Sequence, residues 1–414
     1  MPGTKQSPRR NPALALCLAV FAVTGCHALE EPRNRAALDE GAGYQTTLRD
    51  FADEDDAAKV FGTTLRAGMG LSRCRANTRY DSLPLLEPHG REAPISRGDL
   101  LRVDVLDDAF LSGDFEIEAD GMIRLSQMPP YLAHGVPAPV LERRIRRGLV
   151  EEGYYRGDGP PVSIRIAERA AIRVHVSGAV FEEGVAEINR KSAEAVDTLR
   201  QTAIGDMPNA RTLSAALRGV AGLRPDADVQ RIVLRREGRA YRIDMKRAAT
   251  GRRFFDPLMM ADDEVEVPSM GCFQPGLARI GPLTRKGINA NLSNLIAPAF
   301  HNSAAAVDDD VRELKYGTTL LQTLFRMNCV GGIAATNANR HAIHVSRNPL
   351  TGEMEVIRRS IEELIRRADR DEHNPVMMPD DSVGCYDSTV TNIRDVLSSF
   401  EVLGVPVSLL LGLL

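Results

Sequence analysis

The sequence predicts a mixed α+β protein with three units in series, and three observations lead to that class. The chain has 414 residues, which is too long for one ordinary domain. Residues 94–168 combine strand-like alternation with one amphipathic helix, and two later stretches, 172–268 and 275–386, repeat a strand–helix–hairpin–strand pattern. The last stretch, 389–414, has the apolar and polar arcs of an amphipathic helix.

The first unit is expected to contain strands, a hairpin and one helix. Apolar and polar residues alternate over 101–105, as in a half-buried strand. The stretches 115–118 and 122–125 flank an Asp-Gly pair, which is typical of tight hairpin turns, so we expect these stretches to pair. Residues 137–153 place apolar side chains on one helical face and four arginines elsewhere, and 162–166 alternates again as a strand.

Two later stretches repeat each other closely enough to define a module. The run Asp256–Val265 is echoed by Asn374–Val383 at an offset of 118 residues, and the helical run 212–217 is echoed by 319–324. Between these runs each copy has a predicted hairpin. The two hairpins span 231–245 and 341–357.

A pair of glycines also repeats. Gly178 and Gly184 match Gly281 and Gly287, each at an offset of 103 residues. With these glycines taken as equivalent, each module has an insertion before its helix, which we expect to protrude toward a partner or a neighbouring copy. The insertions span 189–211 and 289–318.

The N-terminus has the layout of a secretory signal. Three basic residues lie within the first ten positions, and Ala13–Val23 is an apolar run of 11 residues, too short for a stable membrane span. The four residues that end at Cys26 resemble a bacterial lipobox, so we expect residues 1–25 to be a lipoprotein signal peptide and Cys26 to be lipidated. Because His27 follows rather than Asp, the outer membrane is the expected location.

Secretion changes how the other cysteines are interpreted. Beyond the signal and Cys26 the chain has four, an even set that favours disulfides in an oxidising compartment and leaves three pairings open. No Cys-x-x-Cys pair or Cys/His spacing typical of zinc sites occurs. The four are Cys74, Cys272, Cys329 and Cys385. Residues 26–93 have no clear periodicity and are expected to form a linker or a small cap.

Residues that could carry chemistry are better explained by structure. His341 and His344 would point to opposite faces of a strand, so we do not expect them to share a metal. The Asp-Asp pairs 262–263 and 380–381 recur before the last strand of each module, where turns favour aspartate. We therefore expect no catalytic residues, no metal and no cofactor. A formal charge of −4 without a long basic run argues against nucleic acid as a partner.

Taken in order, these motifs resemble those of outer-membrane polysaccharide export lipoproteins. The run Gly98–Val105, with the Asp-Gly turn and the helix that follow it, looks like the polysaccharide biosynthesis/export domain of that family. The stretches that begin at Gly178 and Gly281 resemble its soluble-ligand-binding β-grasp (SLBB-like) domains. The resemblance implies an α+β chain with a polysaccharide-export domain, two β-grasp-like modules and a C-terminal amphipathic membrane helix.

The resemblance also implies a function. Such proteins form a homo-oligomeric ring around a periplasmic cavity through which capsular or extracellular polysaccharide passes, with an inner-membrane polysaccharide copolymerase below. Glu183 and Lys286 stand where the family usually has proline, and the two insertions leave the size of the ring open. The alternatives are a periplasm-facing lipoprotein that binds saccharide or peptidoglycan without forming a pore, and a secreted enzyme that modifies polysaccharide.

A β-grasp fold would select among the cysteine pairings. Cys329 ends the helix of the second module and Cys385 lies in its last strand, and these two elements pack together in a β-grasp domain. The resemblance therefore implies a disulfide between Cys329 and Cys385. Cys74 would then be left to pair with Cys272.

The C-terminal segment 389–414 is expected to line a pore through the outer membrane. Its polar arc includes Asn392, Asp395 and Ser399, and apolar side chains fill the opposite arc. As a straight helix its 26 residues would span about 39 Å, against roughly 30 Å for a bilayer core. In a ring, the polar arcs would face water and the apolar arcs lipid. Pro406 is expected to kink the helix, and the alternative is an amphipathic tail docked on the second module.

Overall fold

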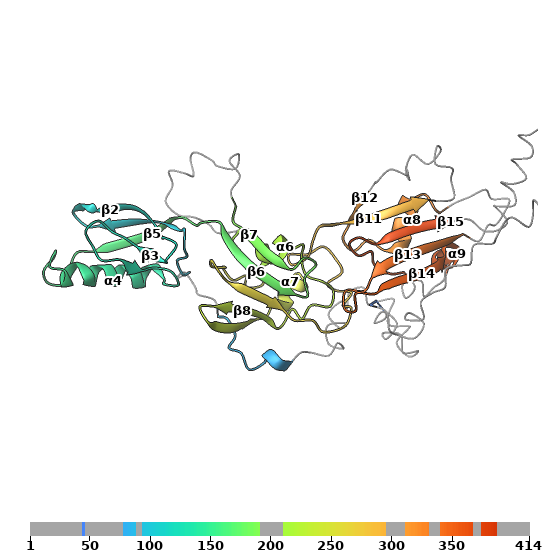
Figure 1. The fold of residues 1–414 in the computed structure, drawn as a ribbon, viewed down its shortest axis with the longest axis horizontal. Coiled ribbons are helices and arrows are strands. Elements are labelled where there is room, and N and C mark those ends of the chain that lie inside the picture. The colour runs from blue at the N-terminus through green and yellow to red at the C-terminus, as the bar shows by residue number, and fades with distance from the viewer. Residues whose placement is uncertain are drawn as a thin grey trace, which may run out of the picture.

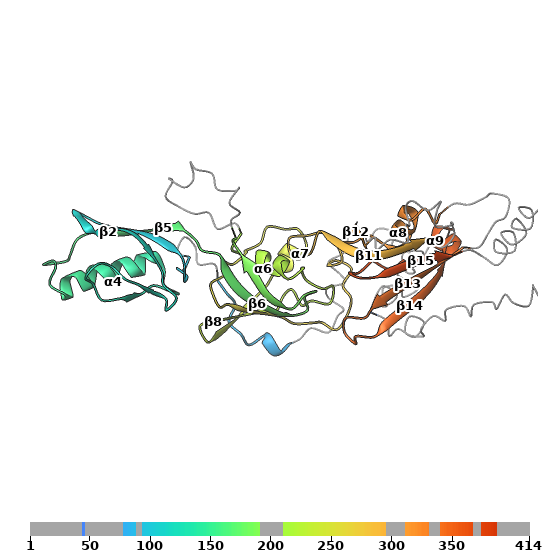
Figure 2. The ribbon, with the colours of Figure 1, turned by 45° about the horizontal axis from the view of Figure 1, so that its top comes forward.

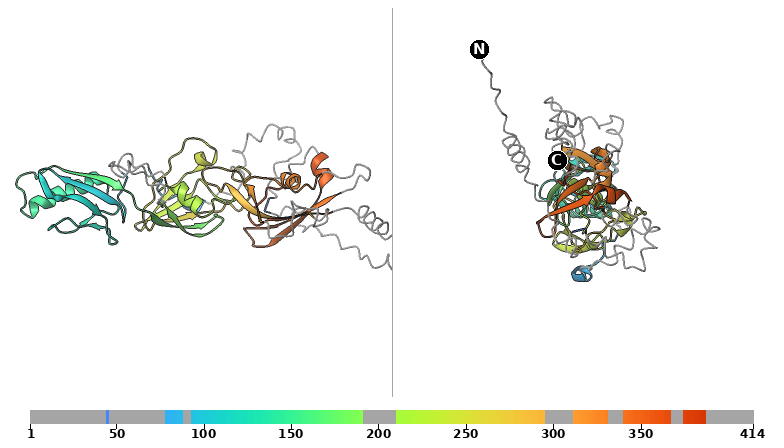
Figure 3. Two further views of the ribbon diagram at one scale, coloured as in Figure 1. Left: turned by 90° about the horizontal axis from the view of Figure 1, so that it is seen from above. Right: turned by 90° about the vertical axis from the view of Figure 1, so that its right-hand side faces the viewer.

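The computed structural model describes residues 44–45, 78–87, 93–190, 210–294, 311–330, 340–366 and 374–386. These residues form a mixed α+β protein in which three units, each with its own sheet and hydrophobic core, follow one another in single file (Figures 1 and 2). The view from above shows the same row (Figure 3). We call these parts the N-terminal unit (93–168), the first module (172–268) and the second module (287–386).

The N-terminal unit is an antiparallel three-stranded sheet covered on one face by a helix. Its strands are β1 (Leu100–Val105), β2 (Asp108–Glu116) and β5 (Val162–Glu168), in the order β2-β1-β5. Helix α4 (Ala138–Glu151) lies close to its predicted position and buries Leu141, Ile145 and Leu149 in the core of the unit. The arginines of α4 lie on its exposed side, as expected from the amphipathic pattern.

The hairpin expected between 115–118 and 122–125 forms at its turn, where the backbone nitrogen of Glu118 donates to the Met122 carbonyl (3.0 Å), but not along its strands. The chain does turn at the Asp-Gly pair, where Gly121 has a φ of +81°. However, β2 pairs along most of its length with β1, and β3 (Met122–Ile123) pairs with β4 (Tyr131–Leu132). The reason is an earlier turn at Asp107, whose φ is +60°. That turn folds β2 back onto β1, so β2 has a partner before the Asp-Gly turn begins.

The first module is a five-stranded sheet packed against a helix. Its elements are β6 (Ile172–Gly178), β7 (Gly184–Ile188), α6 (Leu213–Gly219), β8 (Ile232–Arg236), β9 (Arg239–Ile243), α7 (Lys246–Ala249) and β10 (Glu264–Val267). The strand order is β7-β6-β10-β8-β9, with β10 parallel to β6 and the other neighbours antiparallel. The predicted hairpin forms, and both residues of its Glu237-Gly238 turn have positive φ.

The second module repeats this topology. Its elements are β11 (Gly287–Asn294), β12 (Val311–Lys315), α8 (Leu320–Arg326), β13 (His341–Arg347), β14 (Met354–Ser360), α9 (Ile361–Arg366) and β15 (Ser382–Tyr386). The order β12-β11-β15-β13-β14 again places a parallel pair, β11 and β15, in the middle of the sheet. Helix α8 begins at a capping box formed by Thr319 and Gln322.

The repeated glycines do not occupy equivalent places, so the equivalence at an offset of 103 residues is wrong. Gly184 opens the edge strand β7, whereas Gly287 opens β11, which is the counterpart of the inner strand β6. Val176 pairs with Val265 in the first module as Leu292 pairs with Val383 in the second. Backbone pairing, rather than glycine spacing, therefore defines the true alignment of the two modules.

The expected insertion over 289–318 is also wrong in its bounds. Strand β11 continues to Asn294 and β12 begins at Val311, so the extra residues of the second module lie between its first two strands. In the first module the extra residues lie between β7 and α6. The segments themselves, 191–209 and 295–310, lie outside the described residues.

Part of the expected linker, 26–93, packs on both modules. Residues 84–86 run along the edge strand β9: the backbone nitrogen of Leu86 donates to the Arg242 carbonyl and that of Arg242 donates to the Pro84 carbonyl, both at 2.8 Å. The short helix η4 (Thr78–Tyr80) precedes them. Further upstream, the side chain of Gln45 exchanges hydrogen bonds with the backbone of Val376 in the second module (2.8 and 2.9 Å). These stretches act as a strap that crosses the boundary between the modules.

Candidate functional site

The residues expected to meet the membrane lie outside the described part of the chain. These are Cys26, the segment 389–414 and its polar residues Asn392, Asp395 and Ser399. Among the residues that the structure describes, no helix is both long and apolar enough to cross a membrane. The described part of the chain contains the cysteine pair, the aspartate turns and the joints between units.

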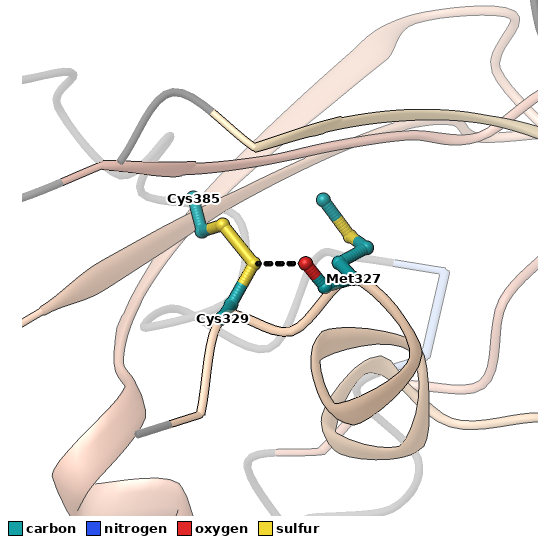
Figure 4. Close-up of a disulfide and its surroundings, with 3 residues drawn as sticks. All are labelled: Met327, Cys329 and Cys385. Atoms are coloured by element: carbon teal, nitrogen blue, oxygen red, sulfur yellow. Dashed lines mark hydrogen bonds between the residues drawn. A yellow bond between two sulfur atoms is a disulfide. The ribbon is translucent and has the colours of Figure 1, made fainter. Parts of the chain in front are cut away.

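The expected disulfide between Cys329 and Cys385 is confirmed. Cys329 follows α8 and Cys385 lies in β15, with both side chains fully buried and their Cα atoms 6.3 Å apart (Figure 4). The bond therefore ties the end of the helix to the last strand across a sequence separation of 56 residues. Cys272 is also disulfide-bonded, and Cys74, the partner expected for it, lies outside the described residues.

The two Asp-Asp pairs form turns that hold a buried carboxylate. Asp262 and Asp380 have φ values of +65° and +63°, which aspartate tolerates better than most residues. The second aspartate of each pair is buried and accepts a hydrogen bond from the backbone nitrogen three residues earlier, at 2.7 Å for Asp263 and 2.8 Å for Asp381. Both pairs thus have the structural role expected from their repetition.

Each buried carboxylate is paired with a side chain of the neighbouring hairpin. The guanidinium of Arg236, at the end of β8, lies 2.6 Å from Asp263. In the second module, Nε2 of His344 lies 2.6 Å from Asp381. His341 lies on the other face of the same strand, as expected, so the two histidines do not come together. The described residues contain no group of three or more side chains suited to hold a metal ion.

The first joint, between the N-terminal unit and the first module, centres on Asp99. Its buried carboxylate accepts hydrogen bonds from the backbone nitrogens of Ser96 (2.9 Å) and Ala170 (3.0 Å). It also accepts one from the guanidinium of Arg211 (2.5 Å), whose side chain is only 1% exposed. Arg211 donates as well to the carbonyl of Met259 (2.9 Å). One carboxylate thus holds both units through an ion pair shielded from water.

Polar contacts at the edge of the first joint reinforce it. Arg97 pairs with Asp262 of the aspartate turn, and Nε2 of His134 lies 3.7 Å from Glu237 in the β8–β9 turn. Burial lowers the pKa of His134 below its ordinary value of 6.5, the Arg97 charge adds to that shift, and Glu237 opposes it. The imidazole is therefore neutral at neutral pH, and Arg97 supplies the positive charge at this edge.

The second joint, between the two modules, centres on Asp226. Arg224 binds its carboxylate with two hydrogen bonds of 2.9 Å, and the hydroxyls of Ser269 (2.5 Å) and Tyr44 (2.9 Å) donate to it. Burial alone would raise the pKa of Asp226, but the hydrogen bonds from Arg224 and Ser269 outweigh it, and the pKa lies below the ordinary value of 3.8. Asp226 is therefore ionised at neutral pH.

Tyr44 connects this joint to the second module. Its backbone nitrogen donates to Glu355 of β14 (3.0 Å), and its ring packs edge-on against Phe273 with centroids 5.4 Å apart. Burial raises the pKa of Tyr44 well above 10.0, and the Asp226 charge adds to this, so the hydroxyl remains a donor. A residue near the N-terminus thus binds both modules at once.

Sequence patterns did not reveal the joints. Asp99 belongs to the motif that carries the family resemblance, and Arg211 directly precedes a predicted helix, but neither position shows that they meet across 112 residues. Tyr44 lies in a stretch interpreted as a linker. A polar residue placed among apolar positions was the available signal for Asp99, because such a residue needs a partner once it is buried.

Comparison with known proteins provides no relative: no protein-family model matches this chain, and no curated protein matches it. The order of the three units and the two joints therefore carry the functional argument.

Proposed function

We propose that this chain is an outer-membrane lipoprotein subunit of an oligomeric translocon that exports capsular or extracellular polysaccharide. The observation that carries the proposal is the single file of one α+β unit and two modules of identical strand order. Reading along the chain, these would be the polysaccharide-export domain and two β-grasp-like modules. A parallel central pair flanked by antiparallel neighbours, as in both modules, is what a β-grasp sheet requires.

The two joints support a role as a stiff building block. The first joint is an ion pair between two units, Asp99 with Arg211, and loss of one partner of such a buried pair costs about 3–5 kcal/mol because the other charge stays buried. At the second joint, Tyr44 links the buried Asp226 of the first module to Glu355 of the second. A chain of units held this firmly would keep its length when copies assemble side by side around an axis. A ring of such copies would enclose a cavity as long as the row of units.

Both segments expected to reach the membrane join the second module. Tyr44, which is 18 residues after Cys26 in the sequence, contacts that module, and Tyr386 at the end of β15 leads into the segment 389–414. The lipid anchor and the pore helix would therefore both extend from the second module, the anchor from its boundary with the first module and the pore helix from the end of β15. The N-terminal unit would then lie farthest from the outer membrane, facing an inner-membrane polysaccharide copolymerase.

Electron microscopy of the full-length protein extracted in detergent tests the proposal. We expect ring-shaped particles, and we expect export of polymer to stop when the chain is truncated after Ser388 although the remaining domains stay folded. Particles of a single copy, together with normal secretion by the truncated protein, would instead favour a saccharide-binding lipoprotein without a pore.

A separate experiment tests the lipid anchor. Stable anchoring needs more than one acyl chain, and each buried CH₂ contributes about 0.8 kcal/mol. The Cys26→Ser variant should therefore be lost from outer-membrane fractions before it oligomerises. A variant that still sediments with outer membranes at that stage would show that lipidation is not the anchor.

A further inference from the structure

The exposed side of α4 carries a cluster of arginines without acidic partners. Arg143, Arg144, Arg146 and Arg147 lie opposite the buried residues of the helix, and none of them forms an ion pair with any described residue. Arg144 donates to the carbonyl of Leu132 at 3.2 Å, and the side chains of the other three form no hydrogen bond with a residue that the structure describes. Arg143 and Arg147 are one helical turn apart, and like charges at that spacing destabilise a helix. Glu142 precedes Arg146 by four positions and Glu151 follows Arg147 by four, so acidic residues of the helix offset part of this cost although none forms an ion pair with the cluster.

The opposite face of the same unit has a small excess of negative charge. Helix α4 covers only one face of the three-stranded sheet (Figure 1). On the other face, β1, β2 and β5 carry half-buried and exposed side chains. Arg102 and Asp114 form a bidentate pair there, with both contacts at 2.7 Å. Asp104 and Glu116 are exposed and form no ion pair with a described residue, and Arg165 is the remaining cation of this face.

Exposed apolar side chains accompany both charged surfaces. Leu106 and Phe110, at the turn between β1 and β2 and at the start of β2, are 57% and 60% exposed. Leu132, whose carbonyl accepts from Arg144 beside the arginine cluster, is 47% exposed. Interfaces between proteins combine apolar contacts with charges of opposite sign that set the orientation of the partners. The N-terminal unit therefore presents two complementary surfaces on opposite sides.

We propose that neighbouring copies of this chain pack head to tail through their N-terminal units, with Arg143, Arg146 and Arg147 of one copy facing Asp104, Glu116 and Phe110 of the next. Two different surfaces on opposite sides of one unit generate a heterologous contact, which closes into a ring when the rotation between copies permits it. This proposal rests on the proposed function, because it assigns the contact that would build the ring.

Charge reversal tests this contact in the full-length lipoprotein in detergent. Arg143→Glu with Arg147→Glu makes the helix face acidic, and Asp104→Arg with Glu116→Arg makes the sheet face basic. Each pair should weaken assembly by about tenfold or more, because like charges then meet at every contact. A chain with all four substitutions should assemble again with the charges exchanged. A matched control, Arg252→Glu with Arg253→Glu, alters exposed arginines of the first module and should assemble as the unaltered chain does.

Mixing sharpens the test. The two chains with one reversed face should each fail to assemble alone. Their co-expression should produce particles that contain both chains. The acidic helix face of one chain then meets the basic sheet face of the other, and the two unaltered faces also match in charge. Assembly of either reversed chain at the normal level would overturn the proposal, as would failure of the fourfold chain to assemble while its thermal unfolding is unchanged. Normal assembly with reduced retention of an anionic polysaccharide would identify polymer as the occupant of the arginine face and overturn it too.

The same experiments distinguish an error in this proposed contact from an error in the proposed function. Rings that form equally well from the unaltered and the reversed chains would leave the translocon intact and remove only this contact. An unaltered chain that forms no assembly at all in detergent would remove both.

Discussion

The two modules cap the first turn of their helices in the same way. In the first module, the carboxylate of Asp256 accepts hydrogen bonds from the backbone nitrogen (3.0 Å) and hydroxyl (2.6 Å) of Ser214 at the start of α6. In the second module Asn374 takes the same place at α8 and accepts one from the backbone nitrogen of Leu321 (2.8 Å). Both helices also end alike, with Ala221 and Asn328 at positive φ. The cap at the start of the helix and the positive-φ residue after its end thus occupy equivalent positions in the two modules, even where the residue type has changed.

The two modules differ at the residue that follows the helix and faces the core. The backbone nitrogen of Gly222 donates to Leu217 (2.9 Å) as that of Cys329 donates to Leu324 (3.0 Å), so these two positions are equivalent. The first module has a glycine where the second has half of a disulfide. A side chain at Gly222 would collide with the backbone of Thr284 and Arg285 in the connection to the second module. The first module is packed against neighbours at both ends, whereas a covalent bond closes the core of the second.

Removal of the disulfide should have the largest effect on stability, and that effect should be confined to the second module. Replacement of Cys329 by Ala and Cys385 by Val should destabilise it by roughly 4 kcal/mol, the entropic value for a closed loop of this length. Hydrogen exchange should accelerate in β13 and β15, while β8 and β10 keep their protection. Equal loss of protection in both sheets would show that the modules unfold as one unit.

The next largest difference in stability between the two modules should come from their buried aspartates. Asp263→Ala leaves the guanidinium of Arg236, which is 10% exposed, without its partner and should cost about 3 kcal/mol. Asp381→Ala leaves the imidazole of His344 without this hydrogen bond and should cost about 1–2 kcal/mol. Denaturant unfolding followed by hydrogen exchange measures both, with the Asn variants as isosteric controls. Equal costs would show that the imidazole depends on its buried carboxylate as strongly as the guanidinium does.

The joint between the modules should respond to acid. The pKa of Asp226 in the folded protein lies below the ordinary 3.8, so folding stabilises its ionised form. That contribution is fully present above pH 3.8 and is lost as the pH falls through the lower folded value. Asp226→Asn should reduce stability at pH 7 and flatten its decline below pH 4, as thermal unfolding across pH would measure. A decline as steep in the variant would assign the acid sensitivity to other groups.

Much of the architecture could be predicted because it depends on local pattern. The apolar face of α4, the Glu237-Gly238 turn and the two aspartate turns are each determined by residues close in sequence. The disulfide followed from the expected fold, since the end of α8 and strand β15 pack together. The α+β class rests on these same elements.

Predictions that required a partner from elsewhere in the chain were wrong or absent. Strand β2 was assigned to the wrong neighbour because the Asp-Gly pair was a better turn signal than Asp107. The glycine repeat aligned the wrong strands, since backbone pairing is invisible in glycine spacing. The ion pair of Asp99 with Arg211 joins residues from two units, and no local pattern records which distant arginine meets a buried carboxylate.

The smallest expected effect distinguishes the two helix caps. Asp256→Ala removes two hydrogen bonds and a negative charge near the positive end of the α6 dipole. Asn374→Ala removes a neutral acceptor from α8 and the hydrogen bond that its amide nitrogen donates to the hydroxyl of Thr319 (3.2 Å). We expect a cost of about 1 kcal/mol for each, larger by a few tenths for the aspartate. Exchange of the two residues is the matched comparison: Asp256→Asn should lose the charge term, whereas Asn374→Asp should gain it and lose the hydrogen bond donated to Thr319. Since salt screens that term, the difference between the caps should shrink when denaturant unfolding is repeated at high ionic strength. A difference that persists in salt would mean that the second hydrogen bond, to the hydroxyl of Ser214, strengthens the first cap instead of the charge.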